Sequence, residues 1–273
     1  MTAGPVAANF ARCWTGTHFG RLCRRMNRDW LARYRVGQRE QVWHELRQLG
    51  AAVREPEIRA EAQLVCDEMA VRARHNIEVI VERLTQDGFR FHTNDDKQTP
   101  VTPHIPPTPT AAQFADWLEQ RFGPVPLTLL SWVRLVGDVW LVGTHPEWPK
   151  SASADPLVIQ IEGSHHPNHS IKDYFTDEWE QWHEHAEKRP ESGPFMLDLA
   201  PDRLHKENTS GGPPYGMRLP DACADGLLRA ETSLPFVEYL NWVFCRAGFP
   251  HYTGGGTREW EVTYKRGRDL LRL

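Results

Sequence analysis

The chain has 273 residues, of which 40% are hydrophobic and 25% are charged, and its formal net charge is −4 at pH 7. This length allows one large domain or two modest ones, and the composition is typical of a globular protein and not of a disordered one. The weak net charge does not indicate nucleic acid as a partner. Eleven tryptophans favour aromatic packing or a recognition surface.

Five cysteines, with no C-x-x-C pair and wide spacing, argue against a disulfide framework and against a zinc ribbon. The first fourteen residues lack a basic stretch followed by a long apolar core, so we expect no secretory signal. No apolar run approaches the roughly 18 residues of a membrane helix. These features predict a cytoplasmic protein without a membrane partner.

The N-terminal third is predicted to be helical. Apolar residues recur at helical intervals over 20–54, with Gly50 as an interruption. Pro56 suits the first turn of a second helix, and Gly88 suits its C-terminal cap. Two such helices predict an antiparallel hairpin within a helical region spanning 1–92.

A short strand is predicted at 89–92, followed by a proline-rich linker at 93–109. Beyond it, at 110–273, helices and short strands follow one another, which predicts a mixed α+β domain with a small antiparallel sheet. Its expected helices span 111–123, 126–137, 173–189, 233–249 and 258–273, and its expected strands span 138–143, 156–161, 195–201 and 215–221.

Charge is unevenly distributed along the chain. Residues 1–90 carry a net charge of +4 and residues 91–273 a net charge of −8. The segment 10–39 holds eight arginines and one acid, interleaved with aromatic residues. A solvated helix face with buried aromatics is favoured here over a nucleic-acid surface. The acidic helix at 173–191 is a candidate internal counterpart.

His165, His166 and His169 stand close together in the chain. Neutral imidazoles bind divalent metals, so converging histidines can form a zinc site. Their spacing matches no closed zinc pattern, however. A polar loop is favoured, no metal or other cofactor is expected, and a metal site is the alternative.

The segment 205–221, HKENTSGGPPYGMRLPD, raises the question of a catalytic or phosphate-binding loop. Two consecutive prolines after the glycines remove two N–H donors, which weakens the phosphate interpretation. His205 as a base beside Lys206 is one alternative. A rigid turn that leads into a strand at Tyr215–Leu219, braced by hydrogen bonds to carboxylates such as Asp202, is the favoured one.

Several of these elements resemble the SUKH superfamily, which includes immunity proteins of bacterial toxin systems and a fungal cell-wall regulator. The similar features are the proline-led helix with Trp132, the turn at Gly137, and the late helix with the F-x-E-Y-L pattern at 236–240. The chain also resembles a group of uncharacterised bacterial proteins through segments at 155–158, 199–216, 236–240 and 248–250.

The resemblance implies a SUKH-like fold and a non-enzymatic protein-binding module, such as an immunity protein that neutralises a toxin domain. A binder needs aromatic and charged anchors on a rigid scaffold. The candidates for partner contact are Trp148, His205, Lys206, Asn208 and Tyr215. The alternative is a metal-dependent hydrolase that uses the histidine cluster or the His205 loop.

Overall fold

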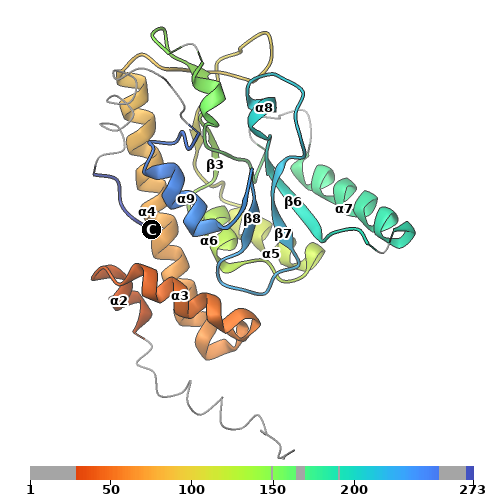
Figure 1. The fold of residues 1–273 in the computed structure, drawn as a ribbon. Coiled ribbons are helices and arrows are strands. Elements are labelled where there is room, and N and C mark those ends of the chain that lie inside the picture. Colours follow the sequence, from red (N-terminus) through yellow and green to blue (C-terminus); the bar gives the residue numbers. More distant parts are fainter. Residues whose placement is uncertain (1–28, 149, 164–169, 190, 252–268) are drawn as a thin grey trace, which may run out of the picture.

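The computed structural model describes residues 29–148, 150–163, 170–189, 191–251 and 269–273. The fold is mixed α+β: helices come first, and small antiparallel sheets packed with helices follow (Figure 1). The coarse prediction of an α+β protein is therefore confirmed. Within the described residues, no helix combines the length and the apolar character that crossing a membrane requires.

The N-terminal helices differ in one respect from the prediction. A single helix over 20–54 is wrong within the described residues, because Gly37, with a φ of 104°, separates two helices. The interruption at Gly50 and the start of the long helix at Pro56 are confirmed, and Gly88 follows the end of that helix with a positive φ. The elements are α2 (Trp30–Arg35), α3 (Arg39–Leu49), the 3-10 helix η1 (Gly50–Arg54) and α4 (Pro56–Gln86).

Polar contacts tie these helices to the remainder of the chain. Arg47 of α3 pairs with the buried carboxylate of Asp225 at 2.7 Å. Burial raises the pKa of Asp225 to about 6, although Arg47 acts in the opposite direction. The Arg54 guanidinium donates to the carbonyl oxygens of Val125 and Ala222. Of the described arginines in the basic segment, Arg33 pairs with Glu45, Arg35 pairs with Glu68, and the Arg39 guanidinium lies over the ring of Tyr34.

Three small antiparallel sheets follow. The predicted linker at 93–109 contributes a strand to the second of them, since His104 stands opposite Val139. The loop before Tyr215 leads into a strand, as predicted. The sheets are β1 (Arg90–Phe91) with β4 (Gly143–Thr144); β2 (His104–Ile105), β3 (Asp138–Trp140) and β5 (Val158–Ile159); and β6 (Phe195–Ala200), β7 (Tyr215–Leu219), β8 (Leu227–Arg229) and β9 (Ser233–Pro235).

The remaining helices flank these sheets. The late helix begins only at Phe236 because the strand β9 precedes it, and most of the predicted helix at 258–273 lies outside the described residues. The helix α7 runs outward from the edge of the sheet next to β6 (Figure 1). The bounds are α5 (Ala111–Phe122), α6 (Leu127–Leu135), η2 (Ser151–Ala154), α7 (Ile171–Lys188), α8 (Arg203–Lys206) and α9 (Phe236–Phe244).

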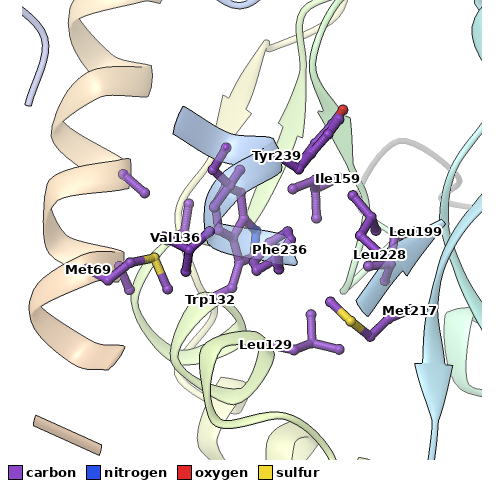
Figure 2. Packing of buried hydrophobic residues seen from close by; sticks show 14 of the residues in the cluster. Met69, Leu129, Trp132, Val136, Ile159, Leu199, Met217, Leu228, Phe236 and Tyr239 are labelled. Carbon is purple, nitrogen blue, oxygen red and sulfur yellow. The ribbon is translucent and has the colours of Figure 1, made fainter. Parts of the chain in front are cut away.

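A continuous apolar core lies between the long helix and the sheets. Figure 2 shows Met69 of α4, Trp132 of α6 and Phe236 of α9 converging, with Met217 and Leu228 of the four-stranded sheet on the other side. The rings of Trp132 and Phe236 meet edge to face at 5.4 Å. Burial of such side chains removes apolar surface from water and provides the main driving force for this arrangement.

Candidate functional site

A pocket of about 760 Å³ opens between α7 and the sheet edge at β6. Its volume lies within the range of small-molecule and peptide sites, about 300–1,000 Å³. The walls come from α7, from β6 and the turn into α8, and from residues at the ends of β3 and β5. The lining residues are Asn94, Trp140, Gln160, Ser170, Ile171, Asp173, Tyr174, Asp177, Asp198, Leu199, Ala200, Pro201, His205 and Pro214.

The wall formed by α7 is positioned by one apolar side of that helix. Phe175 is 1% exposed, and Trp179 meets the ring of Phe195 on β6 edge to face at 4.7 Å. At the first turn, the backbone N–H of Asp173 donates to Oγ of Ser170, the N-cap, at 3.3 Å. With this side buried, Asp173, Tyr174 and Asp177 line the pocket.

Asp198 projects from β6 into the pocket, at an alternate position to the buried Leu197 and Leu199. The hydroxyl of Tyr174 donates to Oδ2 of Asp198 at 3.3 Å. Burial, reinforced by the negative charge of Glu178, raises the pKa of Asp198 to about 6. The Tyr174 hydrogen bond and the charge of Arg229 oppose this shift only in part, so the pKa of Asp198 stays above the ordinary value of an aspartate.

Gln160 brings an amide to the same pocket. Its backbone N–H donates to the carbonyl oxygen of Leu199 at 2.8 Å, which joins the end of β5 to β6. The residue is 8% exposed, and Nε2 has no hydrogen-bond partner among the described residues. A buried donor without an acceptor costs free energy, typically about 1–3 kcal/mol, unless a water or a ligand accepts from it.

The charged groups that line the pocket are of one sign. Asp173, Asp177 and Asp198 contribute carboxylates, and none of the described lining residues is lysine or arginine. None of the three makes an ion pair within the described part of the chain. Carboxylates facing one cavity generate a negative potential there, which attracts cations.

His205 lies at the rim and is joined to Asp202. Asp202 caps α8 by accepting from the N–H of Leu204 at 2.8 Å, and it also accepts from Nδ1 of His205. Burial opposes ionisation of Asp202, but these hydrogen bonds prevail and hold its pKa below the ordinary value. The predicted brace between His205 and Asp202 is therefore present. The His205 side chain is 47% exposed and lines the pocket.

Lys206 and Tyr215 lie beneath the loop, in a buried cluster around Asp155. Nζ of Lys206 is 2.5 Å from Oδ1 of Asp155 and 4.6 Å from the centroid of the Tyr215 ring. The Tyr215 hydroxyl donates to Oδ2 of Asp155 at 3.2 Å. Burial lowers the pKa of Lys206, although Asp155 opposes the shift. These two predicted contact residues are thus engaged inside the protein.

The other predicted contact residues lie apart from the pocket. Asn208, with a φ of 59°, donates to Oδ1 of Asp96 at 2.6 Å on the surface. Trp148 is 8% exposed and packs against Phe249, with ring centroids 5.0 Å apart, so most of its surface is in the core.

The predicted metal ligands His165, His166 and His169 lie outside the described residues. Among the residues that are described, no group of three or more histidine, cysteine, aspartate and glutamate side chains is placed to hold a metal ion. The metal-dependent alternative therefore remains a prediction.

Asp198, Gln160 and Tyr174 were not among the residues predicted from the sequence. Two of them carry a signal there: Gln160 interrupts the apolar run PLVIQI, and Asp198 interrupts FMLDLA. A polar residue within a predicted strand marks either a solvent-facing position or a site, and the pattern alone does not separate the two.

No family, curated protein or solved structure matches the chain.

Proposed function

We propose that the protein is a non-enzymatic binding module that receives a basic protein partner on α7 and in the pocket beside it. The observation that carries the proposal is the pocket lined by Asp173, Asp177 and Asp198 without a lysine or arginine among its described lining residues. The resemblance to the SUKH superfamily supports the same class of function. An immunity protein that neutralises a basic toxin domain is the role which that resemblance implies.

Electrostatics favours such a partner. Beyond the pocket, α7 exposes further carboxylates, which outnumber its two lysines; Glu180 pairs with Arg121 and Glu184 with Lys188, and Glu187 is also exposed. A face of one sign accelerates encounter with an oppositely charged protein and disfavours partners of like charge. Among the pocket carboxylates, Asp198 is partly buried without a counter-ion in the described part of the chain, so it gains most from a partner's cation, whereas Asp173 and Asp177 are exposed.

The test compares two pairs of substitutions on the same helix. We expect Asp173→Asn with Asp177→Asn to weaken binding of a nonaarginine peptide about tenfold, and Glu184→Gln with Glu187→Gln to weaken it about threefold or less. Both pairs remove two negative charges, but only the first lines the pocket. Fluorescence anisotropy at physiological salt measures both affinities. Equal losses, or no binding by the wild-type protein, would contradict the proposal.

The Asp202–His205 pair favours a second candidate function, general acid–base chemistry. An imidazole held at Nδ1 by a carboxylate and exposed to a pocket is the arrangement of a general base, and the titratable Asp198 lines the same pocket. Such a site requires a nucleophile or an activated water beside it, and within the described residues the His205 ring bonds to Asp202 and not to a serine, threonine or cysteine.

His205→Ala separates the structural role from the catalytic one. Loss of the hydrogen bond to Asp202 is expected to lower stability by about 1 kcal/mol, or about 2–4 °C in the melting temperature of a chain of this length. Scanning fluorimetry measures the shift, with hydrolysis of nitrophenyl esters and phosphates assayed in parallel. An unchanged melting temperature together with lost hydrolysis or lost peptide binding would assign His205 to function.

A further inference from the structure

We propose that the pocket binds a guanidinium group together with an adjacent peptide carbonyl, that is, one arginine residue of a partner's exposed segment. The inference deepens the proposed function and rests on it. The chemical group that enters the pocket follows from the acidic residues and, independently of them, from the unpaired amide of Gln160.

The carboxylates define the charged end of the ligand. Asp198 lies on the strand side of the pocket, and Asp173 and Asp177 lie on the helix side, one helical turn apart. A guanidinium presents five donors in a planar fork, so it can bond to carboxylates on two sides at once, whereas an ammonium acts as a point charge. Opposing carboxylates from α7 and β6 therefore fit the planar cation better.

Apolar and aromatic surface suits the rest of an arginine side chain. The indole N–H of Trp140 donates to the carbonyl oxygen of His92 at 2.9 Å, so the indole contributes ring surface to the lining. Tyr174 is 40% exposed and lines the opposite wall, and Ile171 and Leu199 add aliphatic surface. Arginine places its methylene stem along such surface and its guanidinium plane against aromatic rings.

Gln160 offers the pocket a hydrogen-bond donor, which a cation without an acceptor atom cannot use. Its side chain is more than nine-tenths buried, lines the pocket, and has an Nε2 donor without a partner in the described chain. A donor cannot bond to a guanidinium, which has no acceptor. A ligand that takes the place of water beside Nε2 therefore carries an oxygen acceptor as well as a positive charge, and the carbonyl of a peptide backbone meets that requirement.

The pocket's response to pH provides a second readout. The charges that act on Asp198 are those of Glu178 from α7 and Arg229 from β8, and the Tyr174 hydroxyl is in direct contact. The other titratable groups that line the pocket are Asp173, Asp177 and His205. Protonation of Asp198 removes the negative charge nearest the strand wall. Because its pKa is about 6, affinity for a cation is expected to fall about tenfold between pH 7.5 and pH 5.

The experiment titrates three small probes into the 15N-labelled full chain and follows the amide resonances. N-acetyl-L-arginine amide carries the cation and two carbonyls, N-acetyl-L-citrulline amide is its neutral analogue, and n-butylguanidinium carries the same single positive charge without a carbonyl. We expect the arginine amide to shift the resonances of Gln160, Tyr174 and Asp198 and the citrulline amide to bind at least about tenfold more weakly. Asp198→Asn should weaken the arginine amide about tenfold and flatten its pH dependence. Glu187→Gln, on α7 but outside the pocket lining, is the matched control.

Gln160→Met tests the carbonyl contact. Its loss of affinity for the arginine amide should exceed its loss for n-butylguanidinium by about threefold or more. Equal losses would overturn the peptide part and indicate a small alkylguanidinium as the ligand. Citrulline amide binding as tightly as arginine amide, or shifts confined to surfaces away from the pocket, would overturn the whole inference. If the arginine amide fails while nonaarginine binding still depends on Asp173 and Asp177, the inference fails and the proposed function stands.

Discussion

Lys206→Met is expected to destabilise the protein by about 3–5 kcal/mol, because it leaves the carboxylate of Asp155 buried without its counter-ion. The side chains of Lys206 and Asp155 are 0% and 1% exposed, so water cannot replace the lost ammonium. Methionine is close to lysine in length and apolar, so the substitution removes the charge and creates little empty space. Two contacts to the carboxylate remain. The hydrogen bond from the Tyr215 hydroxyl, at 3.2 Å, does not neutralise it, and Nε2 of His251 lies 3.9 Å from Oδ2.

A double-mutant cycle isolates the ion pair from the packing. Asp155 has a φ of 56°, a left-handed conformation that asparagine also adopts readily, so Asp155→Asn removes the charge with little backbone cost. The double variant is expected to recover about 1–3 kcal/mol of the loss, since neither buried charge is then left alone. Urea denaturation measures all four free energies of unfolding. Equal stabilities of the single Lys206→Met variant and the double variant would contradict a dominant role for the isolated charge.

The same single variant has a defined pH dependence. An unpaired buried carboxyl has a raised pKa in the folded state. The folded variant therefore loses stability relative to its unfolded chain as the pH rises above about 3.9, the pKa of an aspartate in the unfolded chain. The difference between wild-type protein and Lys206→Met should therefore be smaller at pH 4 than at pH 7. This cluster positions the loop that carries His205 to the pocket rim, which makes it a support of the site and not a contact surface.

Local signals account for what the sequence predicted well. The helix from Pro56 carries apolar residues every three or four positions, and a proline and a glycine mark its ends. Its bounds are therefore determined by residues that lie close together in the sequence. The pair of Asp202 and His205 lies three residues apart within one turn, so its contact is local too. Gly37 lies between Val36 and Gln38, and its positive φ, which ends α2, has no equally clear signal.

The remainder depends on pairings between distant segments. The strand at His104 forms because β3 lies alongside it, and no feature of the proline-rich stretch 93–109 predicts pairing with β3. The pocket likewise brings together Asp173 of α7, Asp198 of β6 and Gln160 after β5. In the sequence, each of them is compatible with an ordinary solvent-exposed polar residue. Only the packing of α7 on β6 makes them neighbours, and that packing follows from burial of one aromatic side of the helix.

Because the pocket depends on the packing of α7 on β6, substitution of Phe175 is expected to have the second large effect. Phe175→Ala is expected to remove about 3–5 kcal/mol from the attachment of α7, the usual range for a buried phenylalanine. Among the described residues of α7, Phe175 is the one buried side chain, and Trp179 and Trp182 are only partly buried. The loss should therefore appear as local opening of this helix and not as unfolding of the core.

Amide hydrogen exchange separates local from global effects. Exchange in α7 should accelerate about 100-fold or more, since each 1.4 kcal/mol corresponds to a factor of ten. Exchange in α4 should change little, and the arginine amide should no longer bind, because one wall of the pocket has been released. Phe236→Ala is the matched control: the residue is 0% exposed and packs on Trp132 in the central core, so its loss should lower the melting temperature and accelerate exchange throughout. Equal acceleration of α7 and α4 in Phe175→Ala would show that the helix unfolds with the core, and the pocket would then be a rigid feature of the fold.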